Sequence, residues 1–451
     1  MLFARHLRRH RAIWLSGRIW RGRLVFATGA VAIGIAAVLF AQAADLATEL
    51  FSWLRVRWPY LPLALAPLGF GFCAWAARRW FDGAQGSGIP QAIAARRSRD
   101  PAHRRRLLGA RVTLGKVALT VLGLGVGASI GREGPTVQVG AAIMLAVAGF
   151  AGVGRVRGLV LAGAAAGVAA AFNTPLAGVV FAIEEMAKEF EHRISGPVVG
   201  AVVLAGITGL ALVGDYRYFG HTSAQLGTAQ DWLAVPLCGI VGGLLGGAFS
   251  LGVLTMATRR NGLVAAIKSW PVCFAVACGL GVAVLGLLTD GYATGTAYDQ
   301  ARDLLEHGVA MPWWQAPLKL VATLLSSISG IPGGLFAPSL SVGAGLGPAL
   351  AAIMPGHDLR ALSLLAMVAY FAGVVQAPLT AFVIVLEMSE GSRMVVPLMA
   401  TALLATGASR LICPHPLYHV LSRNYDQHHP RQGSKAGDRG ARLEPPSQGN
   451  P

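Results

Sequence analysis

Long apolar segments alternate with short polar ones along most of the 451-residue chain. A helix that spans a bilayer needs about 20 residues, and several of these segments stop short of that length at Gly or Pro. Helices that end inside a membrane are tolerated only where protein or a water-filled cavity surrounds their free backbone groups. The pattern therefore predicts an all-α polytopic membrane protein with broken helices around a central site. The apolar segments cover residues 24–44, 60–77, 107–128, 134–152, 158–172, 175–185, 196–213, 235–256, 271–288, 313–329, 335–354, 362–375, 378–387 and 394–412.

The charge of the chain supports a membrane location. Only 13% of the residues are charged and 54% are hydrophobic, with a mean hydropathy of +0.56, whereas soluble domains carry about 25% charged residues. The net charge of +17 is concentrated in arginines of 1–23 and 96–106, which flank apolar segments as cytoplasmic loops do. We expect no nucleic-acid partner, because no basic soluble domain with interleaved aromatic residues is present.

These shifts in composition divide the chain into three parts. Residues 1–23 form a basic segment that we expect on the cytoplasmic side, and the first apolar run after it has no persuasive cleavage site, so we expect a retained helix. Residues 24–424 form one membrane domain. Residues 425–451 are polar and rich in Pro and Gly, which is typical of a disordered tail. The five cysteines mostly lie inside apolar runs without histidine partners, so they are expected to be buried hydrophobic residues and not metal ligands.

An internal repeat relates the two halves of the membrane domain. The segment 131–141 aligns with 334–344 through five identities, at an offset of 203 residues (334 − 131). The segment from Pro175 to Glu184 aligns with that from Pro378 to Glu387 at the same offset (378 − 175). The alternative is that Gly- and Ala-rich membrane helices resemble one another by composition. Duplicated halves are common in transporters, whose sites form where the repeats meet.

Three Gly/Pro loops, at 86–90, 131–135 and 333–338, each lead into an apolar helix. Helix N-termini expose free N–H groups and the positive end of the helix dipole, so they bind anions without a full positive charge. Glycine lets the backbone approach a ligand closely. The three loops favour an anion site, although packing turns between helices have the same composition.

Ionisable residues within the apolar segments are candidates for function. Glu133 lies between Gly131 and Pro135 at a predicted helix start, where a carboxylate would compete with an anion for the same N–H donors; the alternative is a buried structural carboxylate. Arg132 beside it is either a structural or an entrance charge. Lys116 lies in the 107–128 segment, and a buried lysine needs a partner.

These motifs closely resemble the CLC family of chloride channels and chloride/proton exchangers. The resemblance runs from about residue 24 to 424 and includes the three loops, 173–178, 183–186 and 416–418 in family order. It implies a homodimer with one anion pathway in each subunit and two inverted halves per subunit. It also implies a multi-pass protein of the bacterial cytoplasmic membrane with both termini in the cytoplasm.

By motif, the resemblance implies a chloride site that is formed by two side chains and two backbone N–H groups. Ser87 resembles the serine whose hydroxyl binds the anion, and the Gly-Ser-Gly-Ile-Pro form of its loop resembles chloride-selective members. Nitrate-preferring relatives tend to carry proline in place of this serine. Tyr418 resembles the tyrosine whose phenol binds it. The N–H groups of Leu335 and Phe336 complete the site. The alternatives are a helix-capping serine and an interfacial tyrosine. The supporting loop residues are Gly86, Gly88, Pro90, Gly131, Gly134, Pro135 and Gly334.

The same resemblance assigns the proton stations. Glu133 resembles the glutamate that plugs the site when charged and swings away when protonated, which makes it gate and proton carrier. Glu185 resembles the inner glutamate that receives protons from the cytoplasm, and Glu184 is expected to be structural, as is Glu387, its mate in the repeat. The alternative for the pair of adjacent acids is a solvated helix end that continues into Lys188 and Glu189.

One position departs from the family pattern. Lys116 matches a buried lysine that pairs with an acid just after the first loop, but here the stretch is 91–94, Gln-Ala-Ile-Ala, without a carboxylate. The partner of Lys116 is therefore not predicted.

The function implied is exchange of chloride for protons, with these two as transported ions and no cofactor or metal. The alternative within the same fold is a passive gated chloride channel, and Glu185 favours exchange because channel members typically lack an acid there. A second alternative, an intramembrane enzyme, would need a polar catalytic cluster within the spans. The paired His428 and His429 lie instead in the tail, so no enzyme is expected.

Overall fold

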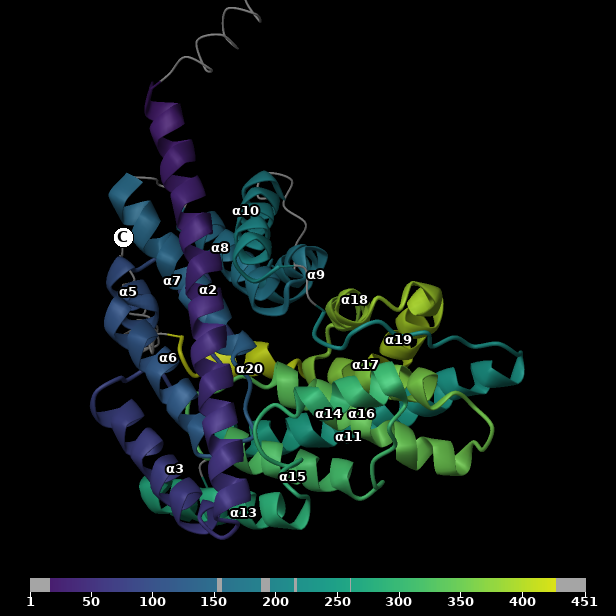
Figure 1. Cartoon of the computed structure of the whole chain (residues 1–451). Helices are drawn as coiled ribbons and strands as arrows, with labels where there is room; N and C mark the ends of the chain where they lie inside the picture. The colour runs from purple at the N-terminus through teal and green to yellow at the C-terminus, as the bar shows by residue number, and fades with distance from the viewer. Residues whose placement is uncertain (1–16, 152–155, 188–194, 215–216, 260, 427–451) are drawn as a thin grey trace, which may run out of the picture.

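The computed structural model describes residues 17–151, 156–187, 195–214, 217–259 and 261–426 of the chain (Figure 1). Among these residues the ordered elements are all helical, and two isolated bridges are the remaining backbone pairings. The elements are α2 (Gly17–Arg57), α3 (Pro62–Arg79), α4 (Ile89–Arg97), α5 (Pro101–Leu108), α6 (Ala110–Gly125), α7 (Glu133–Ala151), α8 (Val156–Phe172), α9 (Pro175–Phe181), the π-helical η1 (Ala182–Ala187), α10 (Ser195–Val213), η2 (Gln230–Leu233), α11 (Ala234–Thr258), α12 (Gly262–Ser269), α13 (Pro271–Leu288), α14 (Tyr298–His307), α15 (Gln315–Ile328), α16 (Phe336–Ile353), α17 (Leu359–Val375), α18 (Pro378–Ser389), η3 (Ser392–Met394), α19 (Val395–Ile412) and α20 (Leu417–Arg423).

The described part of the chain has eight candidate spans that are long and apolar enough to cross a membrane, one of which, Pro101–Gly125, joins α5 and α6, and shorter apolar helices lie among them. This confirms the predicted all-α polytopic fold. Two predicted segments are corrected. The first run does not end near residue 44, because α2 continues as a helix to Arg57 through residues that are more polar but still favour helix. The 107–128 segment is not one helix, because the chain is extended at Gly109 between α5 and α6.

The two halves of the chain interlock. In Figure 1 the early helices, in purple and blue, gather around α2, and the later ones, in green and yellow, gather around α16 and α17. The division is not strict, because α13 of the second half packs against α3 of the first. Within the first half, α7 and α8 approach closely at Gly140 and Gly163. A Cβ on either glycine would come within 2.2 or 2.3 Å of the backbone oxygen of the other.

The repeat is visible in matching backbone detail. Asn173 and Gln376, which are 203 residues apart, both have positive φ, at 55° and 58°, and each is followed two residues later by the proline that begins a short helix. The acids near the ends of these helices are exchanged between the halves. Glu184 accepts hydrogen bonds from the N–H groups of Leu379 and Thr380, at 3.1 and 2.6 Å.

Glu387 completes this exchange, because it accepts from the N–H groups of Leu176 and Ala177 at 3.1 and 2.7 Å. First-turn N–H groups have no acceptor within their own helix, so each half caps the short helix of the other. A second exchange occurs at the centre. Gly131 and its repeat mate Gly334 each donate a backbone hydrogen bond to the other, at 2.8 and 2.7 Å. This crossing of the two loops holds the starts of α7 and α16 together.

Several expectations concern residues outside the described parts. Most of the basic 1–23 segment and nearly all of the 425–451 tail, with His428 and His429, are among them. Lys188 and Glu189, on which the reading of Glu185 as part of a solvated helix end depended, also lie outside the described residues.

Candidate functional site

The first Gly/Pro loop is fixed to its surroundings by backbone contacts. Gly86 accepts from the N–H of Gly333 at 3.1 Å and donates to Ile331 at 3.2 Å, so the loop that carries Ser87 is paired with the loop before α16. Lys116 reaches the same loop from α6. It is fully buried, and its Nζ donates to the backbone oxygens of Gln85 and Gly86 at 3.2 and 2.7 Å. These carbonyls are the partner of Lys116 that the sequence did not predict.

The repeat mate of this lysine makes the same kind of contact. Lys319, at 116 + 203, is also fully buried, and its Nζ donates to the backbone oxygens of Thr294 and Gly295 at 3.0 and 2.7 Å. A buried ammonium group is costly unless its hydrogen bonds are satisfied. Both lysines therefore act as clamps on loops, one in each half of the molecule.

Ser87 lies at the meeting point of the loops. Its hydroxyl oxygen accepts from the N–H of Ile89 at 3.3 Å, which leaves the hydroxyl proton to donate elsewhere. A Cβ on Gly134 would lie 3.0 Å from Ser87 Oγ and 3.2 Å from the Cα of Gly334. The glycines thus let the three loops converge, and the serine is both a cap and an available donor.

The N-terminus of α16 faces this point. Leu335 is the residue before the helix and Phe336 is its first residue, and both are buried. The N–H groups at the start of a helix have no intrahelical acceptor and carry the positive end of the helix dipole. The ring of Phe336 packs against those of Phe371 and Tyr418, with centroids 4.9 and 5.9 Å away. This packing fixes the helix start.

Tyr418 comes from α20 near the end of the described chain. Its side chain is fully buried, and no described atom gives its hydroxyl a hydrogen bond of normal geometry. Ser87 is its neighbour. The hydroxyls of Tyr418 and Ser87 thus lie next to each other near the N-terminus of α16, an arrangement of donors that suits an anion.

Glu133 lies at the crossing of the second and third loops. It is fully buried, and its Oε1 accepts a hydrogen bond from the hydroxyl of Tyr298 at 2.8 Å. Its Oε2 lies 2.2 Å from where a Cβ of Gly131 would be, and the Cβ of Ala337 is 2.9 Å from the same point. The carboxylate therefore folds back over Gly131 onto the first turn of α16, close to the N–H of Ala337.

Arg132, beside this carboxylate, makes its hydrogen bonds in a network that includes α2. It is 5% exposed and forms an ion pair with Asp45. It also donates to the backbone oxygen of Ala41 at 2.7 Å and to the hydroxyl of Tyr218 at 2.8 Å. Tyr218 in turn donates to Ala171 at 2.8 Å. Arg132 thus holds several elements together and, at the same time, lines a cavity.

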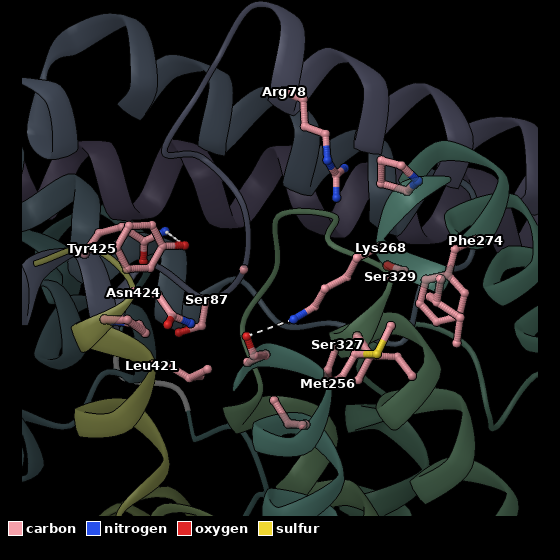
Figure 2. Close-up of a pocket in the computed structure, with 18 residues that line it drawn as sticks. Arg78, Ser87, Met256, Lys268, Phe274, Ser327, Ser329, Leu421, Asn424 and Tyr425 are labelled. Atoms are coloured by element: carbon pink, nitrogen blue, oxygen red, sulfur yellow. Dashed lines mark hydrogen bonds between the residues drawn. The ribbon is translucent and has the colours of Figure 1, made fainter. Parts of the chain in front are cut away.

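Two cavities reach different parts of the site and share no lining residue within the described chain. The first, of about 250 Å³, contains Ser87 together with Arg78 and Lys268, and none of its lining residues is acidic. Figure 2 shows Ser87 on one side of this cavity, with Lys268 at its centre and Arg78 above. Lys268 Nζ donates to Ala257 at 3.1 Å. The second, of about 550 Å³, contains Arg132 and Tyr298, the two neighbours of Glu133.

Glu185 comes from a different element and lies near Tyr418. It is 2% exposed, in the π-helical turn η1 that follows α9, and Nε2 of His419 lies 2.9 Å from its backbone oxygen and 3.7 Å from its Oε1. Its neighbour Glu184 instead faces the N–H groups of α18. The two adjacent acids therefore do point to different partners.

The structure brings together most of the predicted site residues. Ser87, Phe336 and Tyr418 surround one point with the loop glycines, and Glu133 lies on the helix start beside it. Two contacts were missed. Tyr298 opens the amphipathic α14 and has no motif around it, whereas Lys319 could have been found by applying the 203-residue offset to Lys116.

Comparison with known proteins shows the family to which the chain belongs. The family described as voltage gated chloride channel matches residues 69–410, so the chain belongs to this family, which confirms the resemblance. Among curated proteins, it is 32% identical over 403 residues to the H(+)/Cl(-) exchange transporter ClcA of Salmonella arizonae, covering 84% of this chain and 81% of that protein. It is also 32% identical to the ClcA of Salmonella gallinarum over 407 residues, covering 84% and 82%.

Solved structures share the fold. A slow cyanobacterial Cl-/H+ antiporter superposes with a TM-score of 0.78 at 23% identity, covering 90% of this chain and 99% of that one. A CLC-type fluoride/proton antiporter gives 0.74 at 22% identity, covering 87% and 96%. A eukaryotic CLC transporter gives 0.72 at 22% identity, covering 90% and 74%. The protein is thus a multi-pass membrane protein with the CLC fold.

Proposed function

We propose that this protein exchanges chloride for protons across the bacterial cytoplasmic membrane, with Glu133 as gate and proton carrier. The observation that carries the proposal is the position of the Glu133 carboxylate on the first turn of α16. An anion bound by Ser87, Tyr418 and the helix start would compete for the same positive potential. The charged carboxylate closes the path, and a protonated one loses its attraction to the helix N-terminus and leaves it.

The two cavities supply the ends of the path. The cavity that reaches Ser87 contains two cations and no acid among its lining residues, so it attracts anions. The cavity beside Arg132 and Tyr298 leads to Glu133. We assign the first cavity as the entrance through which chloride reaches Ser87. We assign the second cavity as the entrance to Glu133 from the other side of the membrane. Protons reach Glu133 from the first side through Glu185. The basic 1–23 segment and the 425–451 tail are assigned to the cytoplasmic side.

A homodimer is part of the proposal. The relatedness to CLC proteins supports it, and so does an apolar surface on the short helices and their neighbours. Leu176 of α9 and Leu379 of α18 are 54% and 47% exposed at matching positions of the repeat. The N–H groups at these two helix starts are already bonded to Glu387 and Glu184, so the surface beside them is mainly apolar. Photobleaching of single labelled molecules in liposomes should show two steps, and one step would contradict it.

Flux from proteoliposomes tests the function directly. Vesicles loaded with chloride are diluted into low-chloride buffer, and external pH is recorded with a proton electrode. Exchange predicts proton movement against its gradient, driven by chloride. A passive chloride channel, the alternative within this fold, would release chloride without such proton movement. An enzyme would show neither flux.

A further inference from the structure

His419 joins three elements at the edge of the site. It is 8% exposed and follows Tyr418 on α20. Its Nε2 lies 2.9 Å from the backbone oxygen of Glu185 in η1, and its Nδ1 lies 2.6 Å from Nη2 of Arg97 at the end of α4. Arg97 also donates through Nη1 to Ser422 at 3.0 Å. No motif drew attention to this histidine.

These contacts define the protonation of the imidazole. A carbonyl oxygen only accepts, so Nε2 carries the proton and donates to Glu185. A guanidinium group only donates, so Nδ1 is the acceptor from Arg97 and carries no proton. Protonation at Nδ1 would set two N–H donors and two positive charges against each other at hydrogen-bond distance. Arg97 therefore holds His419 as a neutral imidazole.

We propose that His419 is a positioning residue for proton transfer, which fixes the π-helical turn that carries Glu185 to the helix that carries Tyr418. This inference rests on the proposed role of Glu185 as the inner proton acceptor. The imidazole ties the backbone of that acid to α20, so the proton station and the anion ligand share one rigid support. Its Nε2, 3.7 Å from Oε1 of Glu185, also sets where the carboxylate lies.

Arg97 has a role of its own, because its N–H donor and its positive charge oppose protonation of His419 at Nδ1. Among the described residues, the elements packed on α20 and α20 itself carry these charged or titratable groups: Arg96 and Arg97 of α4, Tyr370 of α17, and Tyr418 and Arg423 of α20, with Glu185 of η1 bonded through its backbone. α11, which also packs on α20, has no charged residue, and the charged residue of α17 is Arg360, which bonds to Ser223. Without Arg97, no guanidinium group opposes protonation of Nδ1, so the imidazole can become a cation at acidic pH. A cation at His419 would then stabilise the charged form of Glu185.

The first test compares two substitutions of the histidine by flux from proteoliposomes. The side-chain amide of His419→Gln can donate to Glu185 and accept from Arg97, so we expect its proton-to-chloride ratio within about 1.5-fold of the parent. His419→Leu can do neither, and its ratio should fall at least about threefold while chloride still moves. An unchanged ratio in His419→Leu, or an equal fall in both variants, overturns the proposal.

The second test uses Arg97→Met, which keeps the histidine. Its proton-to-chloride ratio should fall as pH drops through about 6, whereas the parent ratio stays flat there. The double variant Arg97→Met/His419→Gln should lose this pH dependence. A flat profile in Arg97→Met, or the same slope in the double variant, contradicts the proposal. This second test can be carried out even if His419→Leu does not fold.

Glu185→Gln, measured in parallel, separates the two claims. If it loses proton coupling while His419→Leu retains it, the inference about His419 fails and the proposed function stands. If Glu185→Gln retains full coupling, the role of Glu185 fails, and the positioning role of His419 fails with it.

Discussion

The hydroxyl of Tyr298 donates a hydrogen bond to Oε1 of Glu133 at 2.8 Å, across 165 residues of sequence. Glu133 is fully buried and Tyr298 is partly buried, and Tyr298 also lines the cavity of about 550 Å³ that contains Arg132. Tyr298 therefore holds the Glu133 carboxylate where it lies on α16, and it links that carboxylate to the lining of the cavity.

Removal of the Tyr298 hydroxyl should let the Glu133 carboxylate leave the first turn of α16 more often. A hydrogen bond to a charged group contributes about 1.5–3 kcal/mol, so Tyr298→Phe should raise resting chloride flux about tenfold, with proton coupling partly retained. Chloride release from liposomes at pH 7 measures it. Tyr292→Phe is the matched control, because that buried phenol donates instead to the backbone of Ser341. An equal increase in both variants would show that the effect does not come from the contact with Glu133.

Ser87 is expected to set selectivity. Ser87→Pro removes the hydroxyl donor and matches the residue of nitrate-preferring relatives, so the ratio of nitrate-coupled to chloride-coupled proton movement should rise about three- to tenfold, as the loss of one hydrogen bond predicts. Ser87→Ala separates the loss of the hydroxyl from the effect of the ring. Unchanged exchange ratios for both anions in Ser87→Pro would exclude Ser87 as a ligand.

The two buried lysines provide a controlled comparison. Lys116→Met leaves the carbonyls of Gln85 and Gly86 without their donor, next to Ser87, so chloride affinity should fall about tenfold; each unsatisfied group costs about 1–3 kcal/mol. Lys319→Met makes the same change in the other half, away from Ser87. It should lower thermal stability to a similar extent and leave chloride affinity within about twofold. Isothermal titration with chloride and thermal unfolding in detergent measure the two quantities.

Glu185→Gln keeps the size and the hydrogen-bonding capacity of the inner acid but cannot carry a proton. Chloride movement should continue, and proton movement should fall below about a tenth of its original rate. Parallel recordings with chloride and pH electrodes give both values. Continued movement of both ions at the parent ratio would mean that protons enter by another route. The lack of an acid just after Pro90 would then be a second argument against the assigned proton route.

The sequence predicted those features that local patterns carry. The loops at 131–135 and 333–338 were visible from composition, and the common offset matched Gly131 with Gly334, but the hydrogen bonds that join these two glycines were seen only in the structure. Contacts between residues that are distant in the sequence and that only the folded chain brings together could not be predicted. Tyr298 reaches Glu133 only because α14 packs against α16.

The same limit applies to the lysine clamp and the histidine. Lys116 binds backbone oxygens, which have no signature in a sequence, and a search for an acidic partner could not find them. His419 depends on the approach of α20 to α4 and η1, which are distant in the chain. The extension of α2 to Arg57 was missed because helix propensity continues beyond the apolar run.

The central claim is that Glu133 is both gate and proton carrier. Glu133→Gln resembles the protonated state permanently, so the path for chloride should stay open. Glu133→Ala should behave alike, and its shorter side chain leaves room for a second anion on the first turn of α16. A structural carboxylate would differ, since its loss would lower stability or expression and leave coupling intact in the protein that survives.

The most direct measurement is therefore chloride and proton flux recorded together on purified, folded Glu133→Gln protein in liposomes. The account predicts chloride flux at least as fast as that of the parent, nearly independent of pH, with no proton movement driven by a chloride gradient. Retained stoichiometric proton coupling in that sample would contradict the assignment of Glu133.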